Sequence, residues 1–162
     1  MGQTPVISSE AGRNPFELAE PVSRRVQIRS LVLLEGHGLR DPDLSLISYK
    51  NLRPETLVKE ISFARPTDSM RLLVRPSFSM RLVKKEGEAK YEEDSEKSPL
   101  TVEASFIITY VLSSTDGLDE ENFHAFAGTN GVYNAWPYWR EYVSNTVSRM
   151  GLPPITLPVF RF

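Results

Sequence analysis

The sequence predicts an α+β fold in which a small antiparallel sheet packs against one aromatic-rich helix near the C-terminus. Three segments alternate apolar and polar residues with the period of two that is typical of half-buried strands. A fourth segment carries apolar residues with the period of an amphipathic helix. The 162 residues are enough for the core of one domain. We divide the chain into a flexible, proline-containing N-terminal arm over residues 1–21 and a folded domain over residues 22–162.

The composition argues against several classes of function. A net charge of −2 provides no basic field for nucleic acid or for anionic membranes. Cysteine is absent, which excludes disulfides, thiol nucleophiles and thiolate metal sites. No apolar run approaches the roughly 20 residues that span a bilayer, and the first residues lack the apolar core of a secretion signal. We therefore expect a cytoplasmic protein that enters no membrane and binds no nucleic acid.

The first predicted strand covers residues 24–36, and the glycines and the Asp-Pro pair that follow it are expected to end it. Four apolar residues are predicted to share one face of this strand: Val26, Ile28, Val32 and Leu34. Gly36 and Gly38 predict a turn at its end. Residues 44–66 contain two short strand-like pieces and, between them, a stretch that could equally form a helical turn, so their structure stays open.

The second and third predicted strands cover residues 69–85 and 100–114. Pro76 cannot donate a ladder hydrogen bond, so we expect its strand to lie at an edge or to carry a bulge. The charged segment between the two strands, residues 84–99, is expected to be a solvated hairpin loop. The third strand is apolar on both faces, which is typical of a central strand or of one that packs against a second subunit.

Asn130-Gly131 predicts a turn, so the predicted helix begins after it, at an N-cap residue, Asn134, and has Pro137 in its first turn. Gly151 is expected to adopt the left-handed conformation that ends a helix. One stripe forms the core face: Trp136, Trp139, Val143, Val147 and Met150. Tyr138 and Tyr142 widen the apolar side beyond what one packing surface needs. We infer that a partner subunit covers this flank; the alternative is that the apolar tail, residues 152–162, folds back over it.

The sequence contains no recognisable catalytic or metal centre. His37 lies in a predicted turn and His124 between two phenylalanines, so we expect one surface and one partly buried structural histidine. The acidic residues 92–96 lie in the charged loop, where nothing would raise a pKa. Arg71, Arg75 and Arg81 are expected to pair with acidic neighbours or to flank a peptide groove. We therefore predict that the protein is not an enzyme and needs no cofactor or metal.

The segment from Asn134 to Val159 resembles the signature region of SecB chaperones, in which a Pro-Tyr-x-Arg-Glu helix ends in Ser-Arg and leads into a leucine- and proline-rich segment. The matching residues, which we assign to the family and oligomer motif, are Pro137, Tyr138, Arg140, Glu141, Ser148, Arg149, Pro153 and Leu157. The sequence is most similar to the SecB-like chaperones of toxin–antitoxin systems, which share the Gln27-Ile28-Arg29 run and an acidic loop after the second strand.

This resemblance implies a SecB-like fold, with a four-stranded antiparallel sheet and a long C-terminal helix packed on it, assembled as a tetramer formed by two dimers. It also implies an ATP-independent holdase that binds unfolded polypeptides, either a dedicated antitoxin or export-competent preproteins. The sequence has no cysteine for the zinc-binding Cys/His tail of the family, so we expect no zinc-dependent docking to SecA, which speaks against handover to it. The candidate client-contact residues are Ile28, Leu31, Leu33, Phe78, Phe106, Tyr133, Trp136 and Tyr142. The alternative function is a non-catalytic adaptor that binds one folded partner.

Overall fold

The computed structural model describes residues 12–67, 69–85 and 98–162. Four strands form one antiparallel sheet in the order β1-β4-β3-β2. Their bounds are β1 Val26–Arg40, β2 Leu52–Ala64, β3 Arg71–Lys84 and β4 Leu100–Leu112. The helical elements are α1 Pro15–Ser23, α2 Leu46–Lys50, α3 Glu120–Phe126, a π-helical turn Ala127–Gly131, and α4 Val132–Arg149. These elements confirm the predicted α+β class and the four-stranded sheet under a long C-terminal helix.

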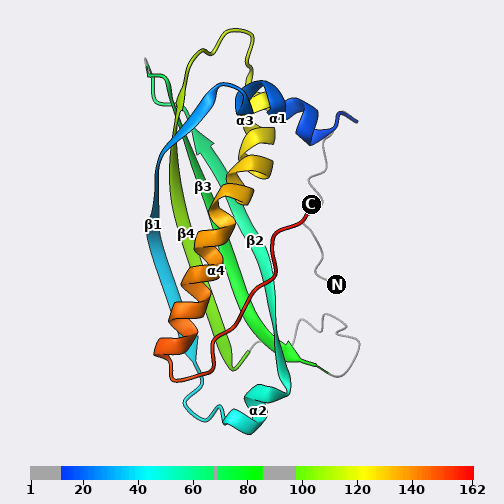
Figure 1. Ribbon diagram of the computed structural model, residues 1–162, viewed down its shortest axis with the longest axis vertical. Coiled ribbons are helices and arrows are strands. Elements are labelled where there is room, and N and C mark those ends of the chain that lie inside the picture. Colours follow the sequence, from blue (N-terminus) through cyan, green and yellow to red (C-terminus); the bar gives the residue numbers. More distant parts are fainter. Residues whose placement is uncertain (1–11, 68, 86–97) are drawn as a thin grey trace.

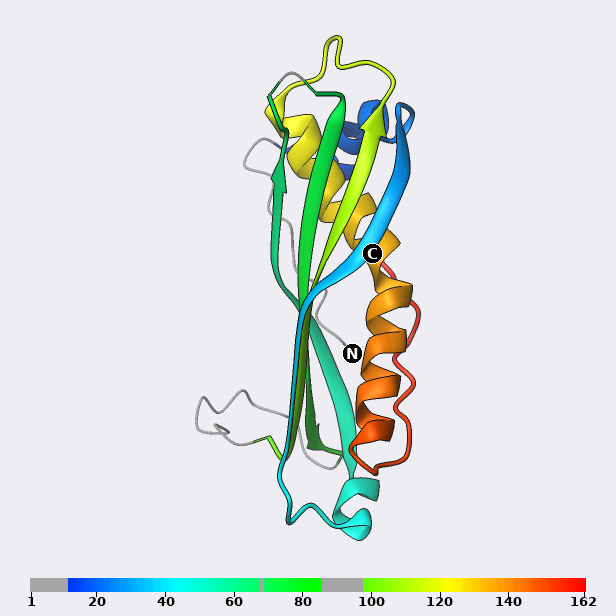
Figure 2. The same cartoon turned by 90° about the vertical axis from the view of Figure 1, so that its left-hand side faces the viewer.

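Helix α4 runs along one face of the sheet, while α1 and α3 lie at one end of it and α2 at the other (Figures 1 and 2). The opposite face of the sheet carries no helix in the described chain (Figure 2). Within these residues no helix is long and apolar enough to cross a membrane.

Helix α1 lies in the segment that we predicted to be a flexible arm. Residues 1–11 of that arm lie outside the described residues. From Pro15 onward the chain is helical, because Asn14 caps the first turn by accepting a hydrogen bond from the Phe16 amide at 3.0 Å. Ala19 and Val22 on this helix are buried. The folded part of the chain therefore begins before residue 22.

Strand β1 continues through both glycines that were expected to end it. Irregularities in its pairing with β4, between Ile28 and Ser30 and between Leu33 and Glu35, are β-bulges that shift the alternation of faces. Ile28 lies opposite Tyr110 and Leu33 opposite Phe106, both core residues. Val32 lies opposite Ile107 on the other face. The prediction of one common face for Val26, Ile28, Val32 and Leu34 was therefore wrong, because each bulge adds one residue to the strand.

Strand β3 lies inside the sheet, so the first of the two alternatives for Pro76, a strand at the edge, was wrong. Pro76 pairs with Ile61 on β2, but the ladder between β3 and β4 has no paired residues at Arg75 and Pro76. The missing amide of proline explains this local gap. Strand β4 is central, as its two apolar faces predicted. Residues 86–97 of the predicted loop lie outside the described residues, and the open segment 44–66 contains α2 and the whole of β2.

The C-terminal helical run begins at Glu120, well before the predicted start at Asn134. Asp119 and Asn122 form a capping box, in which each side chain accepts a hydrogen bond from the other residue's amide at 3.0 Å. The Asn-Gly pair that suggested a turn lies inside the π-helical turn, where Gly131 has a right-handed φ of −61°. A Cβ on Gly131 would lie 2.7 Å from Val74 Cγ1, so a glycine is needed there for close packing on β3 rather than for a turn.

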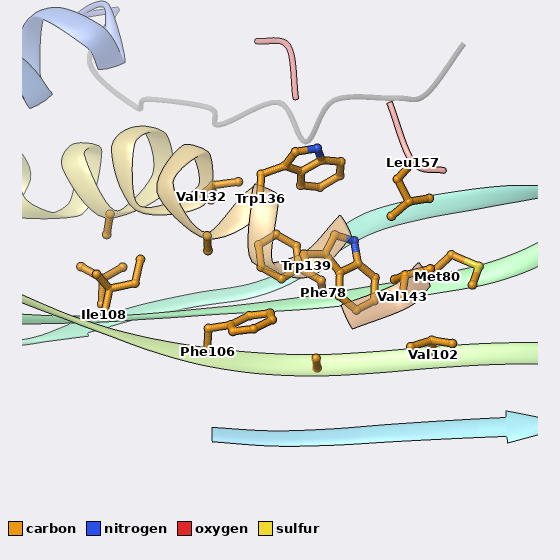
Figure 3. Packing of buried hydrophobic residues seen from close by; sticks show 14 of the residues in the cluster. Phe78, Met80, Val102, Phe106, Ile108, Val132, Trp136, Trp139, Val143 and Leu157 are labelled. Atoms are coloured by element: carbon orange, nitrogen blue, oxygen red, sulfur yellow. The ribbon is translucent and has the colours of Figure 1, made fainter. Parts of the chain in front are cut away.

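The core lies between α4 and the sheet. Four of the five predicted stripe residues are buried, and the ring of Trp139 stacks on Phe78 with centroids 5.4 Å apart (Figure 3). Gly151 ends α4 with a φ of +75°, as predicted. Arg40, at the end of β1, donates a hydrogen bond to the carbonyl oxygen of Met150 and so ties the C-terminus of α4 to the edge of the sheet.

Candidate functional site

The open face of the sheet carries a network of polar side chains. Arg75 on β3 forms a 2.9 Å ion pair with Glu35 on β1, reaching across β4. Lys59 on β2 reaches Glu103 on β4 at 2.8 Å. These residues line a shallow pocket of about 340 Å³. Arg81 also pairs with Glu55, at 2.9 Å. Arg75 and Arg81 therefore have the acidic partners that the sequence predicted.

No cluster of three His, Cys, Asp or Glu side chains that could hold a metal ion exists among residues 12–67, 69–85 and 98–162. His37 is exposed on a strand and not in the predicted turn. His124 is exposed rather than partly buried, because α3 turns Phe123 and Phe126 toward the core and leaves His124 on the outer side.

Two tyrosines have raised pKa values, and both are structural. Burial raises the pKa of Tyr110 to about 12, although the hydrogen bond from Asn134 Nδ2 at 2.8 Å favours ionisation. Burial also raises the pKa of Tyr49, whose hydroxyl donates to the Pro153 carbonyl oxygen at 2.6 Å. Both phenols stay protonated near neutral pH and act as hydrogen-bonding groups that hold α4 and the tail in place.

Strand β1 has the most conspicuous exposed apolar surface. It is an edge strand, so one row of its backbone N–H and C=O groups has no partner strand among the described residues. Ile28 and Leu33, which face the side of α4, are 50% and 47% exposed, and Val32 on the opposite face is 50% exposed. An edge strand that is apolar on both faces is a typical site of protein association.

Side chains of α4 reach the backbone of β1 where β1 carries glycines. A Cβ on Gly36 would lie 2.0 Å from the Tyr142 hydroxyl oxygen, and one on Gly38 would lie 2.5 Å from Met150 Cε. Tyr138 precedes Tyr142 by one helical turn, in the direction of Leu33, and its side chain is 50% exposed. We call Ile28, Leu31, Leu33, Tyr138 and Tyr142 the β1–α4 surface.

The structure brings together only part of the predicted client-contact set. Ile28 and Leu33 are exposed, and Leu31 and Tyr142 are half-buried, all on the β1–α4 surface. Tyr133 is exposed but lies on the other flank of α4, with its ring 6.5 Å from Phe162. Three members are buried in the protomer core: Phe78, Phe106 and Trp136. Direct client contact by these three would require the core to open.

The motif residues are spread over both flanks of α4. Tyr138 and Glu141 are exposed, and so are Ser148, Arg149 and Pro153. Pro137 lies inside the helix rather than in its first turn, since α4 follows α3 without a break. Arg140 Nε donates to the Leu157 carbonyl oxygen at 2.8 Å, and Leu157 itself is buried. The assignment of these residues to an oligomer interface stays a prediction.

Some surface residues were missed in the sequence. Leu39 on β1 is 62% exposed, and Val32 and Leu34 are also exposed, although their pattern suggested a core face. A second apolar patch joins α1, α4 and the tail, where the ring of Phe162 lies 4.9 Å from that of Phe16. For the exposed residues of β1, the available signal in the sequence was a run of apolar residues on both faces of the strand. For the patch formed by α1, α4 and the tail, the sequence carried no clear signal.

The comparisons with known proteins agree on one family, although no family model matches the sequence. Two curated relatives are SecB-like chaperone Rv1957 of Mycobacterium tuberculosis strain ATCC 25618 / H37Rv and SecB-like chaperone MT2006 of strain CDC 1551 / Oshkosh. Each is 36% identical over 76 residues, which is 46% of this chain. The matched stretch spans 41% of the length of each relative.

A solved structure extends the likeness to nearly the whole chain. It shows the Mycobacterium tuberculosis Rv1957 SecB-like chaperone in complex with a ChAD peptide from the Rv1956 HigA1 antitoxin. The TM-score is 0.72 at 25% identity, and the match covers 90% of this chain and 98% of that chain. The shared fold and the sequence identity to the curated relatives support the resemblance to SecB-like chaperones that the sequence predicted.

Proposed function

We propose that this protein is an ATP-independent chaperone that holds non-native polypeptide on the β1–α4 surface. The observation that carries the proposal is the exposure of large apolar side chains on an edge strand beside an exposed tyrosine flank. Such a surface gains free energy by covering apolar segments of another chain, at roughly 25 cal/mol per Å² of apolar area removed from water. Because these contacts are largely apolar, they would tolerate many client sequences.

We propose an antitoxin segment as one class of client. The support is that a solved relative with the same fold is bound to a peptide from an antitoxin. Other unfolded polypeptides, export-competent preproteins among them, are the broader class. The place of action in this proposal is the cytoplasm, and binding needs no nucleotide, metal or cofactor.

The edge of β1 suggests how copies of this chain would assemble. An antiparallel pairing of two β1 strands would satisfy the free backbone groups of both edges. Arg29 and Glu35 stand three residues to either side of Val32, so a pairing centred on Val32 brings unlike charges together. We propose a dimer formed in this way, with two dimers making a tetramer. The dimer would also join two β1–α4 surfaces into one longer apolar surface.

The first test measures how well the protein suppresses aggregation of a chemically denatured client, at one tetramer per client. We expect protection by the wild-type chain and its loss in Leu33→Asp. The matched control is Leu57→Asp, because Leu57 is a similarly exposed leucine on β2 that pairs with Ser79 on the open face. No protection by the wild-type chain, or equal protection by both variants, would contradict the proposal.

Two further measurements separate the alternatives. Binding to one folded protein but not to unfolded peptides would favour the adaptor function instead. Light scattering tests the assembly, since a particle of 18.4 kDa at micromolar concentration would be a monomer and would exclude the dimer.

A further inference from the structure

The C-terminal tail lies on the chain in the manner of a bound peptide. It runs back along α4 on the side of β2 without forming a helix or strand (Figure 1). Three aliphatic side chains, Leu152, Ile155 and Leu157, are buried, whereas Pro153, Pro154, Thr156 and Pro158 are exposed. Ile155 and Leu157 are two residues apart, which is the spacing by which an extended chain presents side chains to one surface.

The folded chain holds this tail by its backbone carbonyl groups. Trp136 Nε1 donates to the Pro158 oxygen at 2.8 Å, Arg140 Nε to the Leu157 oxygen at 2.8 Å, and the Tyr49 hydroxyl to the Pro153 oxygen at 2.6 Å. Every peptide has such carbonyl groups, so these three donors select an extended backbone rather than one sequence. The side-chain preference comes from the apolar site that Leu157 fills beside Met80 and Val143 (Figure 3).

The tail is attached in a way that permits exchange. Residues 153–162 make no backbone–backbone hydrogen bond within the described part of the chain. The tail can therefore leave without breaking a strand ladder, while α4 keeps its own hydrogen bonds. Its departure would uncover Trp136, whose ring lies 4.9 Å from that of Phe160.

We propose that the tail, Leu152–Phe160, is an intramolecular occupant of a second peptide-binding site, from which an extended client segment displaces it. The client segment would carry two branched aliphatic residues spaced i and i+2, as Ile155 and Leu157 are. This inference rests on the proposed chaperone function and adds a regulated site on the flank of α4 opposite the β1–α4 surface. A docked tail lowers the apparent affinity for clients by the fraction of time for which it occupies the site.

The experiment measures binding of a labelled synthetic peptide with the sequence of residues 151–160 to the full chain. Wild type is compared with Leu157→Ala and with the milder Ile155→Ala. Both substitutions weaken docking of the chain's own tail but leave the site on α4 and the sheet unchanged. We expect Leu157→Ala to bind the peptide roughly 30-fold more tightly, since removing a buried leucine side chain weakens docking of the tail by about that factor. Val159→Ala is the matched control, because Val159 is an exposed aliphatic residue of the same tail.

Tryptophan fluorescence gives an independent measurement. The chain has two tryptophans, Trp136 and Trp139, and both lie on α4 in the core that the tail helps to cover. We expect a red shift of the emission in Leu157→Ala and its reversal when the peptide binds. If Leu157→Ala is unfolded by circular dichroism, Ile155→Ala decides the outcome, with a smaller gain of the same sign.

The outcomes separate this inference from the proposed function. If wild type protects denatured clients but neither tail variant binds the peptide more tightly than Val159→Ala does, the tail inference is wrong and the chaperone proposal stands. If the tail variants bind the peptide more tightly but no variant protects a denatured client, the site exists and the chaperone proposal is wrong. Peptide binding that is equally tight in all four chains also overturns the inference.

Discussion

The two flanks of helix α4 differ in how the chain treats their apolar surface. On the flank toward β2, the tail covers the helix and buries Leu157, which is 1% exposed. On the flank toward β1, Tyr142 packs over Gly36, but Leu33 on the neighbouring strand stays 47% exposed. Leucine thus occurs in both environments within one small domain. Among the described residues, the tail covers one flank of α4, and large apolar side chains beside the other flank stay exposed.

The largest effect tests this contrast directly with the same substitution on each flank. We expect Leu157→Ala to lower the free energy of unfolding by about 2–5 kcal/mol, because it leaves a cavity beneath the tail. Leu33→Ala should change it by about 0.5 kcal/mol or less, because its side chain already contacts water. Urea unfolding at low protein concentration measures both, so that association does not contribute. Equal losses would mean that the tail does not pack as described.

The second prediction compares glycines that lie in close contacts. Gly131→Ala should destabilise the fold by about 1–3 kcal/mol, because the new methyl group meets the short, buried side chain of Val74. Gly36→Ala should cost less, because the obstacle there is the end of the Tyr142 side chain, which can swing away. Thermal unfolding of both variants checks the order. A larger loss in Gly36→Ala would show that the β1 flank is the more rigid one.

The third prediction concerns the pH dependence of stability. It tests whether water is excluded from the core beneath the exposed side chains of β1. Tyr110 lies opposite the exposed Ile28, yet burial raises the pKa of its phenol to about 12. An unfolded chain loses this proton near pH 10, and the folded chain keeps it until about pH 12. The contribution of the protonated Tyr110 phenol to the free energy of unfolding is therefore complete below pH ~10 and is lost as the pH rises. At pH 11 the loss is about 1 kcal/mol.

Unfolding measured between pH 9 and 11.5 in wild type and in Tyr110→Phe checks this prediction. We expect the variant to lack this part of the pH dependence. Tyr49→Phe serves as the control, since burial raises the pKa of Tyr49 as well, and its smaller contribution should be removed separately. A Tyr110→Phe curve parallel to that of wild type would show that water reaches Tyr110.

The smallest expected effect concerns one of the hydrogen bonds that hold the tail. Tyr49→Phe removes the donor to the Pro153 carbonyl oxygen and should cost about 0.5–1.5 kcal/mol. Because the bond lies at one end of the tail, limited proteolysis of residues 153–162 should quicken, whereas hydrogen exchange on β1 should stay unchanged. Faster exchange on β1 as well would mean that the two flanks are coupled.

The sequence predicted the fold better than it predicted the candidate site. The core stripe on α4 and the role of Gly151 followed from helical periodicity and from the conformational freedom of glycine. The start of the helix did not follow, because a local Asn-Gly signal favoured a turn where packing of Gly131 on Val74 favours a continuous helical run. The sequence left open, as an alternative to a partner subunit, that the tail folds back over the flank of Tyr138 and Tyr142. The structure shows the tail folded back along α4, but over the flank opposite Tyr138.

For the candidate site, residue type was a weaker guide than position. Phe78, Phe106 and Trp136 are large aromatic residues of the type that binding surfaces use, but all three lie in the core. Ile28, Leu31 and Leu33 lie together on the β1–α4 surface only because a bulge shifts the alternation of β1. A bulge leaves no clear signature in one sequence, so the faces of this strand could not be read from its pattern.

The sequence by itself determined the fold class, the apolar stripe of α4 and the resemblance to SecB-like chaperones, and it left β4 either central or packed against a second subunit. These properties depend on periodicity and on local motifs, which act over a few residues. Only the tertiary structure decided which flank of α4 the tail covers, which face each residue of β1 occupies and where the long helical run begins. Those outcomes depend on contacts between residues far apart in the chain, such as Gly36 with Tyr142 and Arg40 with Met150. Local patterns do not specify such contacts, because burial is a property of the whole fold.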